Sequence, residues 1–247
     1  MNSPHRQAIS RVRQQAPRAL ALTAALGAAV LSAAHAQSSC SSDRQARPVM
    51  LLERFISADC ATCWSAPATP AAGAREIALD WVVPGARGDD APLSAVATRD
   101  SLERMESLRL QPSGSQWERK SRVTGQSGAL RVAHGLPFNG YVGTSIELKP
   151  VPRLARGSQW TGWLALVETL PAGAEGSPVE RNLVRNLFKA QWKTSGANTA
   201  KAAARWFDSR SMSLAEGANP ERLRLVGWVE DAHGRVVNAA VSRCVPP

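Results

Sequence analysis

The chain has 247 residues, of which 44% are hydrophobic and 20% are charged, and its net charge is +10 at pH 7. This length is enough for one large domain or two small ones. Beyond residue 36 the basic residues are interspersed with acidic ones, and no aromatic platform accompanies them, so the composition excludes the common nucleic-acid-binding modules. The sequence also lacks a Gly-x-Ser-x-Gly motif, a phosphate-binding loop and a zinc-protease motif.

Residues 1–36 have the pattern of a cleavable signal peptide. The segment has no acidic residue, and its basic residues are Arg6, Arg11, Arg13 and Arg18. An apolar run over 19–31 follows, and it closes on Ala34-His35-Ala36, the small residues that signal peptidase requires. The run is shorter than the ~20 residues that a membrane-spanning helix needs, which makes an uncleaved anchor the less favoured alternative. We therefore expect a periplasmic or secreted protein with no membrane span after cleavage.

The next part of the chain predicts a tether, a strand and a cysteine pair. Residues 37–47 are polar and predict a tether, and the apolar run 49–55 predicts a buried strand. The strand leads through a short turn into Cys60-Ala61-Thr62-Cys63. Any helix after Cys63 is expected to be short, because the prolines that follow it lack an amide donor and clash with the preceding turn. A second strand is predicted over 77–83.

Between residues 98 and 148 the pattern predicts one helix and two extended segments. Thr98 has the character of an N-cap, with acidic residues in the turn that follows it. Residues 111–127 are polar and are expected to be irregular, whereas 130–133 and 141–148 are expected to be extended. Asn139-Gly140 between these two segments is a turn signal.

The C-terminal part of the chain is predicted to be mostly β. Strand-like segments cover 160–167, 182–188, 223–229 and 236–241. Residues 197–206 are compatible with a short helix or with a strand. A boundary near 150–157 would separate a part over 48–150 from a part over 151–247, although the two parts could also pack as one unit.

All four cysteines lie beyond the predicted cleavage site, and four cysteines allow three disulfide connectivities. Cys60 and Cys63 form a close pair, which leaves Cys40 and Cys244 near the two ends of the expected exported chain. We favour a structural disulfide between Cys40 and Cys244, because exported thiols tend to oxidise. Two free thiols, or disulfides to a partner protein, are the alternatives.

A strand that ends in a turn and a Cys-x-x-Cys pair is typical of thiol–disulfide oxidoreductases. In those proteins the first cysteine lies at a helix N-terminus, where free amides favour the reactive thiolate, and the second cysteine resolves the mixed disulfide. Two local features oppose this reactivity. Asp59 places a negative charge next to Cys60, and the residues between the two cysteines supply no cation.

The segment 51–63 resembles the N-terminal signature of a bacterial exported family, domain of unknown function 1223. The family reads Val-Glu-Leu-Phe-Thr-Ser-Gln-Gly-Cys-x-x-Cys, and Glu53, Phe55 and Ser57 fall in register with it. The family fold is thioredoxin-like, so the resemblance implies an α/β fold class with a thioredoxin-like N-terminal domain over 48–150, followed by the mostly β region 151–247. The family usually has prolines directly after the second cysteine, whereas this chain continues Trp64-Ser65-Ala66-Pro67.

Three hypotheses for function follow. In the first, the chain exchanges disulfides with other exported proteins through mixed disulfides and needs no cofactor, with Cys60 as nucleophile, Cys63 as resolving thiol and Pro137 as the proline that positions substrate. Glu53 would then shuttle a proton for the second thiol, or else form a salt bridge with an arginine. In the second, the chain is a binding scaffold with a structural Cys60–Cys63 disulfide. In the third, Cys60, Cys63 and His134 bind copper or zinc.

Overall fold

The computed structural model describes residues 40–111, 114–125, 129–149, 158–193 and 205–244. The predicted signal peptide, residues 1–36, and the predicted boundary near 150–157 lie outside these described residues. No helix within the described ranges is long and apolar enough to cross a membrane.

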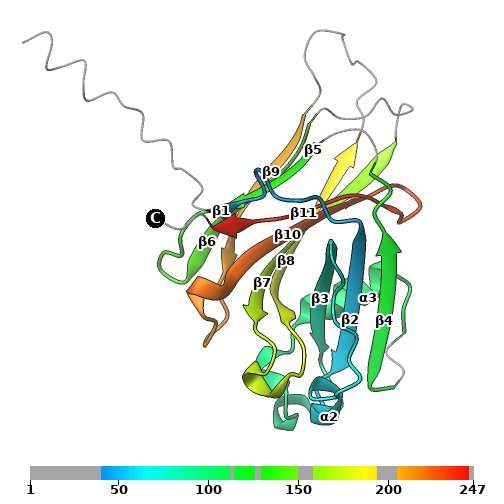
Figure 1. Ribbon diagram of the computed structural model, residues 1–247, viewed down its shortest axis with the longest axis vertical. Helices are drawn as coiled ribbons and strands as arrows, with labels where there is room; N and C mark the ends of the chain where they lie inside the picture. Colours follow the sequence, from blue (N-terminus) through cyan, green and yellow to red (C-terminus); the bar gives the residue numbers. More distant parts are fainter. Residues whose placement is uncertain (1–39, 112–113, 126–128, 150–157, 194–204, 245–247) are drawn as a thin grey trace, which may run out of the picture. The chain divides into compact units, whose positions relative to one another are not determined.

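Strands make up most of the described structure (Figure 1). They are β1 (Cys40–Ser41), β2 (Met50–Ser57), β3 (Glu76–Val83), β4 (Gln116–Arg122), β5 (Ala129–His134), β6 (Tyr141–Lys149), β7 (Gln159–Leu170), β8 (Arg181–Lys193), β9 (Trp206–Ser213), β10 (Leu223–Glu230), β11 (Val236–Val241) and β12 (Arg243–Cys244). The α-helices among the described residues are α2 (Ala61–Trp64) and α3 (Arg99–Ser107). Single 3₁₀ turns cover Gly88–Asp90, Ser94–Val96, Ala174–Gly176 and Pro220–Arg222.

The strands form a seven-stranded sheet in the order β11-β10-β7-β8-β3-β2-β4 and a five-stranded sheet in the order β12-β1-β5-β6-β9. In the larger sheet β3 pairs in parallel with both β2 and β8, and every other pairing is antiparallel. Strands from both sides of residues 150–157 therefore share this sheet. The smaller sheet is antiparallel throughout.

The expected α/β thioredoxin-like fold is wrong for this chain, because the described structure is mostly β. The helix that contains Cys63, α2, has four residues and ends before Pro67 and Pro70, which would interrupt a longer helix. A further difference is β4, which occupies part of the segment 111–127 that we expected to be irregular. Its sequence contains a single large apolar side chain, Trp117, so apolar alternation could not reveal it.

Both faces of the seven-stranded sheet are buried over its central strands, whereas alternate residues of the edge strand β4 are exposed. Alternate residues of β2 point to opposite faces, because the side chains of a strand alternate. Leu51 and Phe55 contribute to a core on the face that α3 covers, which also holds Met105. On the opposite face, the five-stranded sheet packs over the β7, β10 and β11 half through a second core. A third and smaller core, which includes Ile56 and Trp64, lies beneath α2.

The two sheets approach closely at one glycine. A Cβ atom at Gly227 on β10 would lie 2.4 Å from the side chain of Val132 on β5, which is closer than any real contact. Val132 and Ile146 of the smaller sheet pack directly against the larger one for this reason. The absence of a side chain at Gly227 therefore allows the two sheets to pack this closely at β10.

Candidate functional site

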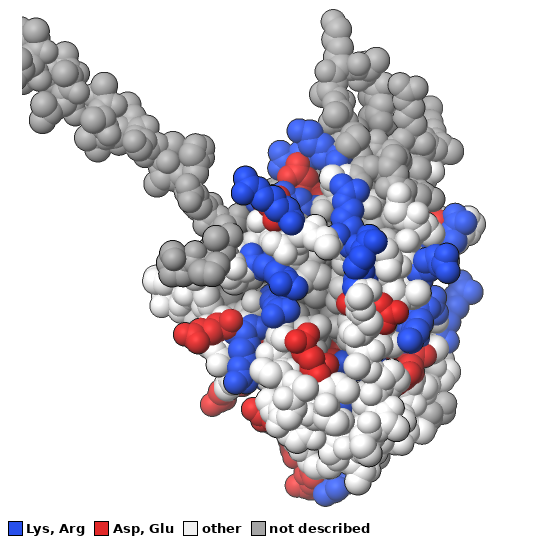
Figure 2. Space-filling model, in the orientation of Figure 1, with Lys and Arg blue, Asp and Glu red and all other residues white. Residues whose placement is uncertain are grey.

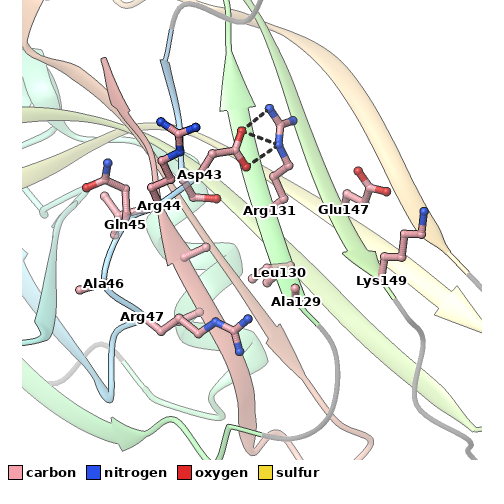
Figure 3. A pocket seen from close by; sticks show the side chains of 14 residues that line it. Asp43, Arg44, Gln45, Ala46, Arg47, Ala129, Leu130, Arg131, Glu147 and Lys149 are labelled. Carbon is pink, nitrogen blue, oxygen red and sulfur yellow. Dashed lines mark hydrogen bonds and ion pairs between the residues drawn. The ribbon is translucent and has the colours of Figure 1, made fainter. Parts of the chain in front are cut away.

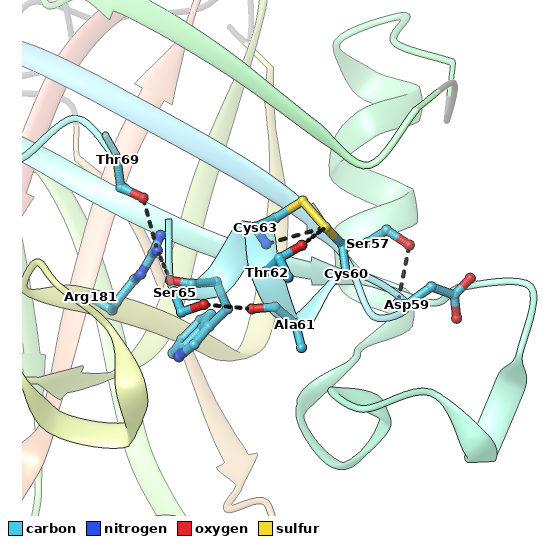
Figure 4. The surroundings of a disulfide bond; sticks show 10 residues. Ser57, Asp59, Cys60, Ala61, Thr62, Cys63, Ser65, Thr69 and Arg181 are labelled. Atoms are coloured by element: carbon cyan, nitrogen blue, oxygen red, sulfur yellow. Dashed lines mark hydrogen bonds between the residues drawn. A yellow bond between two sulfur atoms is a disulfide. The ribbon is translucent and has the colours of Figure 1, made fainter. Parts of the chain in front are cut away.

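The Cys60–Cys63 pair forms a disulfide at the start of α2, directly after the turn that ends β2 (Figure 4). Cys60 is the N-cap of the helix, and its sulfur accepts a hydrogen bond of 3.2 Å from the amide of Cys63. The hydroxyl of Thr62 lies 3.5 Å from the same sulfur. Donors to a sulfur favour its thiolate form, so this local geometry supports a reactive Cys60 once the bond opens.

Asp59 does not direct its charge at the disulfide. Its carboxylate accepts hydrogen bonds from the amides of Ala86 and Arg87, at 2.7 and 3.2 Å. Figure 4 shows the Asp59 side chain turned away from the two sulfurs. The opposition to thiolate formation that the sequence suggested is therefore weaker than adjacency along the chain implies, because the charge is compensated by backbone donors.

A buried cluster of two arginines and one aspartate lies beneath α2. Asp80 accepts two hydrogen bonds of 2.8 Å from Arg54 and one of 2.8 Å from Arg181. Arg181 also donates to the carbonyl of Trp64 at 2.6 Å, and its guanidinium lies over the Trp64 ring at 4.7 Å. A four-residue helix cannot hold itself together, so Arg181 fixes the C-terminal end of α2. This cluster was not predicted from the sequence, where its only signal is a charged residue within each of two strongly apolar strands, Arg54 in β2 and Asp80 in β3.

Trp64 also stabilises the position of α2. Its indole N–H donates to the carbonyl of Glu175 at 2.8 Å, and the ring is buried in the core beneath the helix. Cys63 is half-buried against the same core. Both cysteines are half-buried, and Cys63 is the one that packs against this core.

A cavity of about 330 Å³ opens beside Cys63. Its walls include the edge strand β4, through Trp117 and Glu118, and the arginines Arg54 and Arg181. An apolar ring and a strand edge with unpaired backbone groups are the features that an extended peptide can use. Figure 2 shows that the surface around α2 is mostly uncharged, whereas lysines and arginines gather nearer to β4.

The other predicted site residues lie elsewhere. Glu53 is fully buried and forms a two-pronged ion pair with Arg104, at 2.7 and 2.8 Å, so the salt-bridge alternative is the one observed. Alternation along β2 places Glu53 on the α3 face of the sheet, opposite to the face that carries α2. Pro137 lies in the β5–β6 connection of the five-stranded sheet and does not line the cavity beside Cys63.

His134 lies at the end of β5, paired across the sheet with Cys40. Within the described residues it clusters with Cys40 and Cys244, and the predicted grouping of His134 with Cys60 and Cys63 is not formed. Cys40 and Cys244 are joined by a disulfide between the paired strands β1 and β12. The expectation that the chain contains disulfide bonds is confirmed.

A second cavity, of about 420 Å³, lies between the segment after β1 and strands β5, β6 and β11 (Figure 3). Its two acidic residues are both engaged, since Asp43 binds Arg131 at 2.8 Å and Glu147 binds Arg205 at 3.0 Å. The hydrogen bond from Arg131 lowers the pKa of Asp43 below its ordinary value. Within the described part, the lining cations that take part in no ion pair are Arg44, Arg47 and Lys149. The cavity therefore presents a surplus of positive charge.

Comparison with known proteins leaves the family open. No protein-family model matches the chain, and no curated protein matches it in sequence. Among solved structures the chain is similar to HBP35 of Porphyromonas gingivalis, with 12% sequence identity and a TM-score of 0.44. That similarity covers 81% of this chain and 76% of the other.

Proposed function

We propose that this chain is an exported protein that exchanges disulfides with other exported proteins through Cys60 and Cys63. The observation that carries the proposal is a disulfide at a half-exposed turn, held by an anchored helix and flanked by a cavity with an open strand edge. No cofactor is needed, because both electrons move between sulfur atoms.

The reaction balances through a mixed disulfide. A substrate thiolate attacks the sulfur of Cys60, the Cys60–Cys63 bond breaks, and Cys63 leaves as a thiolate. A second substrate thiolate then attacks the substrate sulfur of the mixed disulfide and releases Cys60. The substrate dithiol is thereby oxidised to a disulfide, this chain is reduced to a dithiol, and two thiol protons are redistributed between the thiols and solvent.

The surroundings suit these steps. The amide of Cys63 and the hydroxyl of Thr62 stabilise negative charge on Cys60 when it is the leaving group. Cys63 packs against the core, so we expect it to react with Cys60 and not directly with a substrate. A substrate segment in the cavity beside Trp117 would bring its cysteine next to the half-buried disulfide, because Cys63 lines that cavity.

The test is to trap the mixed disulfide. The Cys63→Ser variant, incubated with a peptide disulfide, is expected to accumulate a covalent adduct at Cys60, because the resolving thiol is absent. Cys60→Ser is the matched control and should form less adduct, since the amide of Cys63 and the hydroxyl of Thr62 contact the sulfur of Cys60 and favour a thiolate there. Mass spectrometry after digestion identifies the modified residue. Absence of an adduct in both variants, or equal adducts in both, would contradict the proposal.

A second candidate function is binding of an anionic ligand without catalysis, and the unpaired cations of the cavity in Figure 3 favour it. An oligoglutamate peptide is a suitable probe, with fluorescence anisotropy as the readout. Serine at Arg44, Arg47 and Lys149 together should abolish binding at low salt. A control variant with serine at Arg87, Lys120 and Arg122, which are exposed elsewhere, should retain it. Equal losses in both variants would indicate only a general charge effect.

A further inference from the structure

Three metal-ligating side chains lie side by side on adjacent strands of the five-stranded sheet. Cys40 on β1 is directly opposite both Cys244 on β12 and His134 on β5. Directly opposed residues of antiparallel strands project to the same face, so one face carries all three side chains. Their potential ligand atoms lie within 4.8 Å of one another.

His134 has the tautomer that is usual for a metal-bound histidine. Its Nδ1 lies 2.9 Å from the carbonyl oxygen of Gly135, and because a carbonyl only accepts, Nδ1 must carry the proton. Nε2 therefore holds the free lone pair. The residue is 3% exposed, and Nε2 is buried with no hydrogen-bond partner among the described residues. A metal-bound histidine usually donates its other N–H to a carbonyl in this way.

An unsatisfied buried nitrogen needs a reason, because leaving it without a partner costs about 1–3 kcal/mol in general. A metal ion at Nε2 would give this buried nitrogen the partner that it lacks among the described residues.

We propose that reduction of the Cys40–Cys244 disulfide creates a site for one thiophilic metal ion, bound by the two thiolates and by Nε2 of His134. A dithiol reductant supplies two electrons and two protons, becomes a disulfide itself, and leaves Cys40 and Cys244 as thiols. Binding of the ion then releases both thiol protons to solvent. Two sulfurs and one imidazole suit Zn²⁺ or Cu⁺, with a fourth position open to water or to another ligand.

The site is accessible from one side. Cys244 is exposed at the edge of the sheet, whereas Cys40 and His134 are buried. A reductant can therefore reach the disulfide at Cys244, and a metal can enter by the same route. The site is separate from Cys60 and Cys63, so the proposal stands or falls independently of disulfide exchange there.

The experiment uses the full exported chain with Cys60 and Cys63 both replaced by serine. Cys40 and Cys244 are then the only cysteines in the protein. After reduction with a phosphine and removal of the excess, Co²⁺ is added as a spectroscopic probe, followed by Zn²⁺. We expect one equivalent of Co²⁺ with thiolate charge-transfer absorption, displaced by one equivalent of Zn²⁺. The same protein before reduction should bind neither ion.

Two further measurements assign the ligands. Zn²⁺ should protect Cys40 and Cys244 of this reduced protein from alkylation by iodoacetamide, which needs no further substitution. His134→Gln should weaken Zn²⁺ binding by about tenfold or more, whereas His233→Gln, in an exposed turn, should leave it unchanged. The proposal is overturned if the reduced protein binds no Co²⁺, if Zn²⁺ gives no protection, or if binding occurs only after the β-sheet circular dichroism is lost.

Discussion

Glu53 and Arg54 are neighbours in β2, yet each belongs to a different buried ion network on a different face of the sheet. Glu53 pairs with Arg104 of α3, and Arg54 pairs with Asp80. The alternation of a strand explains the separation, because successive side chains leave the sheet in opposite directions. The sequence could identify Glu53 as buried and charged, but its partner comes from a helix far along the chain.

Arg104 is the centre of the first network. It also binds Glu230 at 2.7 Å, and its guanidinium lies about 5 Å above the rings of Trp163 and Trp228. Burial alone would lower the pKa of Arg104, but the two carboxylates outweigh this effect and raise it above its ordinary value.

Replacing Arg104 with alanine should therefore destabilise the fold by about 3–5 kcal/mol, because two buried carboxylates lose their counter-charge. Urea unfolding monitored by tryptophan fluorescence measures the change. Arg99→Ala, in the exposed first turn of the same helix, should cost less than about 0.5 kcal/mol. If Arg104→Ala lowers the free energy of unfolding no more than Arg99→Ala does, the buried ion network does not contribute to stability.

Asp231 fixes the turn between β10 and β11 and makes a pH-dependent contribution. Burial raises its pKa, but hydrogen bonds from Arg235 and from the amides of Arg235 and His233 outweigh this and lower the pKa below its ordinary value. A carboxyl with a lowered folded-state pKa stabilises the fold above its unfolded-state pKa, and the contribution is lost as the pH falls through the folded-state value.

Asp231→Asn should consequently lower stability at pH 7 by about 1 kcal/mol, and the difference from the parent should vanish at pH values below the folded-state pKa. Urea unfolding at a series of pH values tests this. The exposed Asp89→Asn variant is the matched control and should change the stability at pH 7 by less than about 0.5 kcal/mol. A constant difference between Asp231→Asn and the parent down to acid pH would refute the assignment.

At the scale of elements, the sequence predicted the apolar strands well and the polar ones poorly. β2, β3, β7, β10 and β11 are found close to their predicted positions, because their buried residues give a clear apolar pattern. β4 and β9 were not predicted, since their inward-facing positions include charged and hydroxyl residues. Whether two strands share a sheet also depends on pairings between distant segments, which local patterns do not contain.

Gly227 illustrates such a long-range constraint. Alanine at this position should destabilise the protein by about 1–3 kcal/mol, because the added methyl group would push Val132 and the opposing sheet outward. Gly143→Ala is the matched control, since it lies in an exposed strand position with nothing within 4 Å of the new Cβ atom. Thermal unfolding of the two variants compares them, and equal losses would mean that strand propensity, not sheet spacing, dominates.

At the scale of the whole molecule, the Cys40–Cys244 disulfide joins residues 204 positions apart. Closing so long a loop restricts the unfolded chain strongly on the chain-entropy account. Serine at both positions should lower the stability of the oxidised protein by about 2–5 kcal/mol, whereas serine at Cys60 and Cys63, only 3 positions apart, should cost less. Guanidinium unfolding of both double variants measures the difference, and the reverse order would contradict this account.

Some features of the candidate site could be predicted from a short stretch of sequence, whereas others depend on contacts between distant segments. The cysteine pair at the end of a strand was visible in the sequence, because a short motif carries it. The supporting arginines Arg54 and Arg181 were not predicted, since they meet at Asp80 only after three strands come together. The location of His134 beside Cys40 likewise follows from strand pairing alone.

The most direct test of disulfide exchange is the reduction potential of the Cys60–Cys63 pair. Equilibration in glutathione buffers, followed by thiol trapping and mass spectrometry, resolves this pair from Cys40 and Cys244. We expect fast exchange and a potential of roughly −120 to −270 mV, the range of oxidoreductases. A potential below about −300 mV, or no exchange, would mark the disulfide as structural and contradict the proposed function.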